Sequence, residues 1–218
     1  KNDGSKISIF DKDISNFFQK ELFKKYPSIP FFSEEDSENL DNILNEKNFF
    51  LMDPIDGTDS FVKKKDEFTV NLTYVSNDKL IFSCICSPIK NILLYSDEKD
   101  SFKVCGSKKI KLKNKKKNLL DSYKVITTRR QEEITKITNI LKKYNIQYEL
   151  SFASSALKFC ILANGEADIY IRKANIKLWD VISGFHILNN ADFFIKDGNG
   201  NSILEYILDR DYLKSIHK

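Results

Sequence analysis

The six residues DPIDGT, from Asp53 to Thr58, follow the short apolar run FFLM and begin a polar stretch. The carboxylates of Asp53 and Asp56 lie three residues apart across a turn. Pro54 fixes the backbone between them, and Gly57 lets the chain pass close to a ligand. Carboxylate oxygens suit Mg²⁺, whereas zinc favours histidine and cysteine. The segment indicates a magnesium site, although carboxylates that only cap a turn and a helix have the same spacing.

The end of this segment also predicts a place for phosphate. If a short helix begins at Gly57 or Thr58, its free N–H groups point toward the two carboxylates. Such groups hold an oxyanion such as phosphate. A metal ion and a phosphate group would then meet at one place.

Two further acidic groups stand at predicted element boundaries. Glu34-Glu35-Asp36 follows an apolar run, and Trp179-Asp180 opens an apolar helical pattern. Three adjacent acids repel one another without a cation or basic partners, but a solvated loop is the ordinary explanation. Asp180 equally fits a plain N-cap. What favours a joint site is that all the acids lie at element boundaries, where side chains gather at one edge of a layered fold.

Apolar spacing divides the chain into helices and strands. Ile14, Phe17, Phe18 and Leu22 share one face of a helix expected over residues 11–25. Apolar runs bounded by turn residues indicate strands. We expect further helices at 132–144, 154–164 and 181–190, and strands at 49–52, 68–75, 79–87, 92–96, 123–127, 146–150 and 167–171.

The order of these elements predicts two subdomains. Consecutive strands in the first half and alternating strands and helices in the second indicate an α+β fold of layered elements. We expect an N-terminal α+β subdomain (1–105) carrying most metal ligands, a lysine-rich connection (106–119) and a C-terminal α/β subdomain (120–218) carrying Trp179-Asp180. The run KKIKLKNKKK, from Lys108 to Lys117, predicts a solvated loop or hairpin.

Composition excludes several classes of protein. The chain has 218 residues, 41% of them apolar, which suffices for a sizeable core and excludes a disordered tail. Its 35 basic and 31 acidic residues leave a net charge of only +4, so a dedicated nucleic-acid binder is not expected. Because no apolar run approaches the roughly 18 residues of a bilayer span, stable membrane insertion is not expected either. Four cysteines without a CxxC pair predict reduced thiols and a cytoplasmic location.

Four motifs resemble the inositol monophosphatase superfamily, the Mg²⁺-dependent, Li⁺-sensitive phosphomonoesterases. They are SEED (33–36), DPIDGTDSF (53–61), EFTVNL (67–72) and LWDVISG (178–184). The residues FVK after the aspartate motif, the segment SSALKFC (154–160) and Arg172 are most similar to the bacterial 3′(2′),5′-bisphosphate nucleotidase branch. Inositol-specific relatives usually place a glutamate at the position of Arg172, so the exchange favours an anionic substrate. The resemblance implies a layered αβαβα sandwich of the sugar-phosphatase type.

The resemblance also implies roles for individual residues. Two or three Mg²⁺ ions, with inhibition by Li⁺, would be held by Glu34, Asp53, the Ile55 carbonyl, Asp56 and Asp180. Thr58, helped by Asp11, would orient the attacking water, and Glu34 would share in catalysis. The substrate would contact Ile55, Asp56, Gly57, Thr58, Ser155, Arg172 and Asp180.

Three functional hypotheses follow. The first is an enzyme that hydrolyses adenosine 3′,5′-bisphosphate to AMP and phosphate, acting as a monomer or homodimer on this small phosphate ester. The second is an inositol or sugar monophosphatase. The third is an inactive metal-binding remnant, because the family's one or two helices before the position of Asp3 are missing from this sequence. With only His186 and His217 in the chain, a histidine nucleophile has little support.

Overall fold

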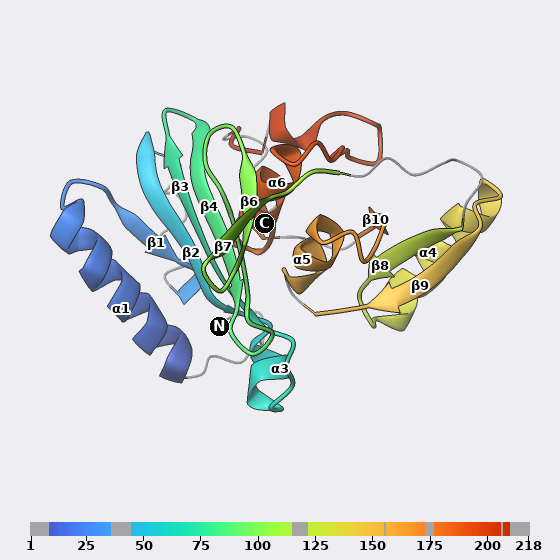
Figure 1. Cartoon of the computed structure of the whole chain (residues 1–218), viewed down its shortest axis with the longest axis horizontal. Coiled ribbons are helices and arrows are strands. Elements are labelled where there is room, and N and C mark those ends of the chain that lie inside the picture. The colour runs from blue at the N-terminus through green and yellow to red at the C-terminus, as the bar shows by residue number, and fades with distance from the viewer. Residues whose placement is uncertain are drawn as a thin grey trace.

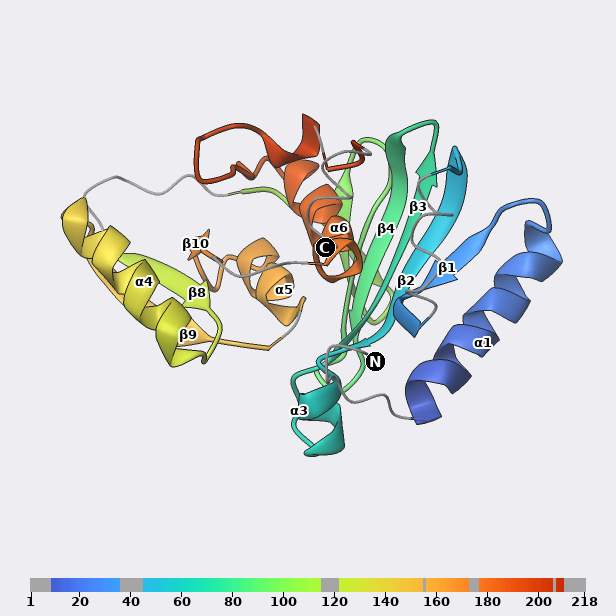
Figure 2. The same cartoon turned by 180° about the vertical axis from the view of Figure 1, so that it is seen from behind.

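A large sheet and a small sheet, each flanked by helices, form the fold (Figures 1 and 2). The computed structural model describes residues 9–35, 45–114, 122–154, 156–172, 177–205 and 207–209. Within these residues the large sheet has seven strands in the order β1 to β7, and the small sheet has three in the order β10-β8-β9.

The large sheet is an antiparallel meander with one parallel edge. Its first strand, β1 (Phe31–Ser33), runs parallel to β2 (Asn48–Asp56). Each later strand pairs antiparallel with the one before it. These strands are β3 (Thr69–Ser76), β4 (Lys79–Ser87), β5 (Ile92–Ser96), β6 (Ser101–Cys105) and β7 (Lys108–Lys111).

The second half of the chain supplies the small parallel sheet and the middle helices. The small sheet pairs β8 (Tyr123–Thr127) in parallel with β9 (Tyr148–Phe152) and β10 (Ile169–Tyr170). The helices are α1 (Ile9–Lys25), α3 (Thr58–Val62), α4 (Gln131–Lys143), α5 (Leu157–Ala163) and α6 (Leu178–Asn189), and a 3₁₀ turn, η2, spans Ile203–Glu205. Figure 1 shows α1, the large sheet, α5 with α6, the small sheet and α4 in succession.

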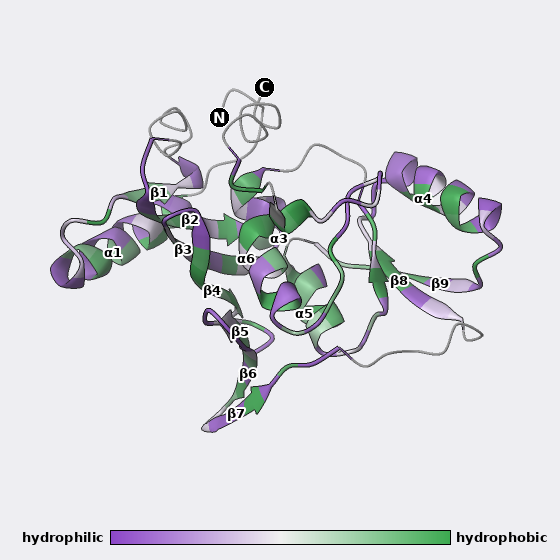
Figure 3. Cartoon of the chain, turned by 90° about the horizontal axis from the view of Figure 1, so that it is seen from above, coloured by the Kyte–Doolittle hydropathy of each residue, from purple (hydrophilic) through white to green (hydrophobic). Residues whose placement is uncertain are grey.

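Alternation along the strands creates this layering, because successive side chains point to opposite faces. Phe50 and Met52 face α1, whereas Phe49 and Leu51 belong to the core under α6. In β8, Val125 packs with residues of α4, whereas the next residue, Ile126, belongs to the same core as α5. In Figure 3, hydrophobic residues line α6, while α1 and α4 carry both hydrophobic and hydrophilic residues. The predicted αβαβα sandwich is confirmed.

Most predicted elements are present, with shifted ends. The helix expected over 154–164 begins only at Leu157. The strand expected over 146–150 is Tyr148–Phe152. The sequence predicts no strand at β6, and at β7 it predicts a loop or a hairpin. The lysine-rich β7 lacks the apolar alternation of a half-buried strand, and all four of its residues are exposed. The Lys-rich run thus includes one arm of a hairpin, and residues 115–117 lie outside the described part of the chain.

The predicted division into subdomains remains a prediction. The strand β7, inside the proposed connection, belongs to the large sheet. Helix α6, inside the proposed C-terminal subdomain, packs against β4 of that same sheet. Among the described residues, no helix combines the length and apolarity that crossing a membrane requires.

Candidate active site

Three aspartates converge where β2 ends and α6 begins. Asp53, Asp56 and Asp180 each offer a carboxylate oxygen, and these oxygens lie within 4.8 Å of one another. The pairing of β2 with β3 is irregular between Asp53 and Asp56, where Pro54 has no N–H to donate. The irregularity brings two residues of one strand to the same point. Residues far apart in the chain thus form one carboxylate cluster, as the motifs predict.

Glu34 joins this cluster through strand register. Ser33, the last residue of β1, is paired in parallel with Met52, so that the residues that follow, Glu34 and Asp53, lie side by side. A side-chain hydrogen bond with Glu34 contributes to the raised pKa of Asp53. Of the two other acids in the predicted group, Glu35 lies in the described part and Asp36 does not.

Burial and the charges of neighbouring acids raise the pKa values of the three aspartates. Burial raises the pKa of Asp53 well above its ordinary value, and the charges of Asp56, Glu34 and Asp180 raise it further. Burial, followed by the charge of Asp56, raises the pKa of Asp180 to about 7. A divalent cation would reverse these shifts by favouring the ionised carboxylates.

Hydrogen bonds orient the carboxylates and leave acceptors open. The Asp56 Oδ2 accepts the Ala156 N–H at 2.5 Å and the Asn71 amide at 3.4 Å. Asp53 and Asn71 face each other across β2 and β3. Asp53 Oδ1 and Asn71 Oδ1 are buried, and neither accepts a hydrogen bond from the described residues. Buried oxygens without donors fit a bound hard cation, so the donor set suits Mg²⁺.

The turn after the cluster has the predicted form. Gly57 has φ 97° and precedes α3 as its N-cap, a conformation that favours glycine. The expected short helix begins at Thr58, and no side chain caps its first N–H groups. Thr58 Oγ1 donates to the Ile55 carbonyl at 3.1 Å. The hydroxyl of Thr58 and the carbonyl of Ile55 are therefore adjacent, on either side of Asp56 in the sequence.

Asp11 lies in the first turn of α1 and is fully buried. The ring of its neighbour Phe10 contacts the ring of Phe61 in α3, with centroids 5.6 Å apart. Figure 1 also shows the start of α1 close to α3. The start of the first helix thus lies next to the turn that carries Thr58.

A cavity of about 380 Å³ opens beside the cluster, and the buried Lys158 and the partly buried Arg172 line it. Its wall includes Asp56, Gly57, Ser60, Glu133, Ser154, Lys158, Tyr170, Arg172 and Asp180. Lys158 is only 4% exposed; burial lowers its pKa to about 8, and the charge of Asp56 opposes that shift. Arg172 shares a side-chain hydrogen bond with Tyr170. Arg172 therefore reaches the predicted site, whereas Ser155 lies outside the described residues.

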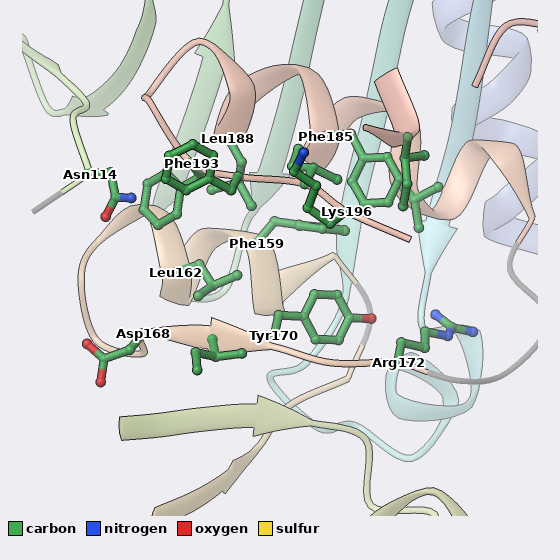
Figure 4. A pocket seen from close by; sticks show the side chains of 15 residues that line it. Asn114, Phe159, Leu162, Asp168, Tyr170, Arg172, Phe185, Leu188, Phe193 and Lys196 are labelled. Atoms are coloured by element: carbon green, nitrogen blue, oxygen red, sulfur yellow. The ribbon is translucent and has the colours of Figure 1, made fainter. Parts of the chain in front are cut away.

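A second cavity of about 400 Å³ lies behind Tyr170 and Arg172, which line both spaces (Figure 4). Its walls are largely aromatic and aliphatic side chains of α5, α6 and the segment after α6, including Phe159, Phe185 and Phe193. In Figure 4 the Tyr170 hydroxyl points toward Arg172. These two residues separate an apolar space from the charged one.

The two halves of the chain meet beside the cavity through contacts that sequence reasoning missed. Arg129 donates two hydrogen bonds to the Glu67 carboxylate, at 2.6 and 2.7 Å. Ser154 donates to the same carboxylate at 2.9 Å and accepts from Ser60 at 3.2 Å. Glu67 lies in the quoted motif EFTVNL, but no spacing rule links it to a residue 62 positions away.

A chain of buried hydrogen bonds fixes α6 on the large sheet. Thr73 bonds to Ser183 at 2.8 Å and to Ser83 at 2.9 Å. Ser83 bonds to His186 Nδ1 at 2.9 Å, and Asn190 bonds to His186 Nε2 at 3.1 Å. Because buried polar groups lose stability without partners, this chain defines where α6, and with it the third aspartate, sits. His186 is thus a packing residue.

Replacing His186 by asparagine is expected to reduce the acid sensitivity of the fold. Burial lowers the pKa of His186 to about 4, with a smaller opposing effect of Asp97. Between that value and the ordinary pKa of about 6.5 the unfolded chain binds more protons, so wild-type stability falls as pH falls. We expect wild type to lose about 1 kcal/mol more than His186→Asn between pH 7 and 5.5. Urea unfolding measures this difference, and His217→Asn is the control; equal pH slopes for wild type and His186→Asn would refute it.

The fold and the site define a class. Carboxylates that suit divalent cations, uncapped N–H groups and basic side chains around one cavity are the arrangement of a metal-assisted hydrolase of phosphate esters. The profile of the Inositol monophosphatase family matches residues 2–215, and the chain belongs to that family. The chain is therefore a phosphatase of this family, and its acidic cluster is compatible with the family's dependence on metal.

Individual members of the family can also be compared with this chain. The chain is 32% identical over 206 residues to "3′(2′),5′-bisphosphate nucleotidase CysQ" of Buchnera aphidicola, an alignment covering 93% of this chain and 75% of the relative. It is 27% identical to the protein of that name from Salmonella typhimurium, covering 93% and 80%. The crystal structure of CysQ from Bacteroides thetaiotaomicron has a TM-score of 0.68 and 25% identity, covering 81% of this chain and 72% of that one.

Proposed function

We propose that this protein hydrolyses adenosine 3′,5′-bisphosphate to AMP and phosphate. The observation that carries the proposal is the pair of cations, the buried Lys158 and the partly buried Arg172, in the wall of the cavity that also holds Asp56 and Asp180. A neutral ring gains nothing from two cations that are partly or fully removed from water, whereas a substrate with a second phosphate would neutralise them. The names of the CysQ relatives, 3′(2′),5′-bisphosphate nucleotidases, support a nucleotide with two phosphates as the substrate.

In this proposal Glu34, Asp53, Asp56, Asp180 and the Ile55 carbonyl hold two or three Mg²⁺ ions. Bound Mg²⁺ supplies positive charge against the phosphate and lowers the pKa of water. The N–H groups at Gly57 and Thr58 bind the phosphate that is cleaved. Thr58 orients the attacking water, whose proton passes through the Thr58 hydroxyl to the carboxylate of Asp11, and Glu34 shares in this step.

The reaction needs no covalent intermediate. The water oxygen forms a bond to phosphorus while the bond from phosphorus to the 3′ oxygen breaks, and that oxygen takes up a proton from solvent water. Arg172, and with it Ser155, would face the remainder of the nucleotide. We keep the predicted cytoplasmic location, which the four free cysteines support, and a monomer or homodimer that binds neither nucleic acid nor membrane.

The proposal is tested by phosphate release from two substrates. We expect Mg²⁺-dependent, Li⁺-inhibited hydrolysis of adenosine 3′,5′-bisphosphate with a kcat/KM at least ten-fold above that for inositol 1-phosphate. Faster hydrolysis of the inositol ester would instead identify a sugar monophosphatase. A folded sample that hydrolyses neither would support an inactive metal-binding remnant.

A further inference from the structure

Glu133 is a buried carboxylate in the wall of the catalytic cavity for which neither the motifs nor the proposed mechanism provides a role. It lies in the first turn of α4, is 6% exposed and lines the cavity together with Lys158 and Arg172. Its Oε2 is buried and accepts no hydrogen bond within the described residues. The preceding residue behaves differently: Glu132 is 79% exposed on its side chain and pairs with Lys136 on the helix surface.

Burying a carboxylate without a donor is costly, since such a group loses hydration and gains nothing in return. The start of α4 offsets only part of this cost. Burial lowers the pKa of Lys158, and the charge of Glu133 is one of the smaller effects that oppose this shift. The Lys158 ammonium group, however, donates to the Ala153 carbonyl at 3.2 Å and lies 5.5 Å from the centre of the Tyr170 ring. Glu133 therefore lines a cavity whose occupant can supply the donor that the described residues do not.

The chemistry of a carboxylate restricts what that occupant presents. A phosphate oxygen would be repelled, so Glu133 does not bind either phosphate. An O–H or N–H group would satisfy it with a charge-assisted hydrogen bond. In adenosine 3′,5′-bisphosphate the ribose 2′-hydroxyl and the 6-amino group of the base are such donors, and both belong to the part of the molecule that leaves.

We propose that Glu133 determines specificity by accepting a hydrogen bond from a hydroxyl or amino donor of the leaving nucleoside. This inference rests on the proposed function. A buried acceptor rejects a substrate that lacks the matching donor, because the acceptor then stays unpaired. Glu133 would thus select the nucleoside while Lys158 and Arg172 select the charge.

The test compares three substrates on wild type, Glu133→Gln, Glu133→Asp and the matched control Glu132→Gln. The substrates are adenosine 3′,5′-bisphosphate, its 2′-deoxy form, which lacks the hydroxyl, and inosine 3′,5′-bisphosphate, which lacks the amino group. We expect Glu133→Gln and Glu133→Asp to lower kcat/KM for the adenosine substrate about 10- to 100-fold, and Glu132→Gln to change it less than two-fold. Wild type should disfavour one analogue at least ten-fold, and Glu133→Gln should reduce that preference to about three-fold. The disfavoured analogue identifies the donor.

Several results would overturn the inference. If Glu133→Gln raised kcat/KM for all three substrates, Glu133 would only repel their phosphates. If it lowered all three equally, or lowered the melting temperature more than Glu132→Gln does, Glu133 would have a structural role. Failure of the proposed function has a separate signature: wild type itself would not hydrolyse the adenosine substrate, which would remove the basis of the inference as well.

Discussion

Replacing Asp53 by asparagine is expected to lower kcat/KM for phosphate-ester hydrolysis by at least about 10³-fold, or about 4 kcal/mol of transition-state stabilisation. Asp53 is 1% exposed and lies at the centre of the carboxylate cluster. Asparagine preserves the shape of the side chain but removes the charge that a divalent cation requires. The loss should therefore appear in catalysis and in Mg²⁺ affinity measured by calorimetry.

The same change is expected to stabilise the protein in the absence of metal. The folded-state pKa of Asp53 is raised by burial and by the neighbouring acids. A carboxyl with a raised pKa binds protons more tightly in the folded chain, so metal-free stability falls as pH rises from the ordinary value of about 4 toward the folded pKa. Asparagine avoids that loss at neutral pH.

Melting temperatures in EDTA and in Mg²⁺ separate the two effects. Wild type should gain stability from Mg²⁺, whereas Asp53→Asn should melt higher than wild type in EDTA and gain little from Mg²⁺. The control is Asp78→Asn, an exposed carboxylate in the turn after β3, which should resemble wild type in both solutions. An Asp53→Asn variant that binds Mg²⁺ as tightly as wild type would exclude Asp53 as a ligand.

The helices and strands whose apolar residues follow a regular local pattern could be predicted from the sequence. The spacing of Ile14, Phe18 and Leu22 predicted α1 because one face of that helix packs on the sheet. Apolar runs bounded by turn residues predicted β2 to β5. By contrast, β7 is an exposed edge strand that gains its place only through pairing with β6. Backbone hydrogen bonds to a neighbouring strand do not require a regular spacing of apolar residues, so the sequence carries no sign of such a strand.

The candidate site likewise has a part that the sequence predicts and a part that only the fold reveals. The aspartate motif predicted a cluster because its residues are adjacent in sequence and constrained by Pro54 and Gly57. The partners that orient it, such as Asn71 and Ala156, come from other strands and helices. Glu133 carries no sequence signal either, since a charged residue in the first turn of a helix is ordinary. Only the fold shows that Glu133 is buried beside the cavity.

Replacing Gly184 by alanine is expected to destabilise the fold by about 2 kcal/mol. Gly184 lies in α6 at its crossing with α5, and a Cβ there would lie 2.2 Å from Cδ2 of Phe159. The Phe159 ring cannot easily move away, because it is 2% exposed and packs edge-on against Tyr170 and Phe185. Overpacking a dense core costs about 1 to 3 kcal/mol, and an overlap this deep lies at the upper end. Alanine gains only about 1 kcal/mol in helix propensity, so the clash outweighs it.

Urea unfolding of three variants tests this balance. Gly198→Ala is the matched control, because a Cβ at that position meets nothing within 4 Å, and its midpoint should stay close to that of wild type. Combining Gly184→Ala with Phe159→Leu should cost less than the sum of the two single changes, since the smaller side chain gives room to the new methyl group. Additive losses, or a Gly184→Ala variant as stable as wild type, would show that α5 and α6 can separate. The helix that carries Asp180 would then be held mainly by its hydrogen bonds to the sheet.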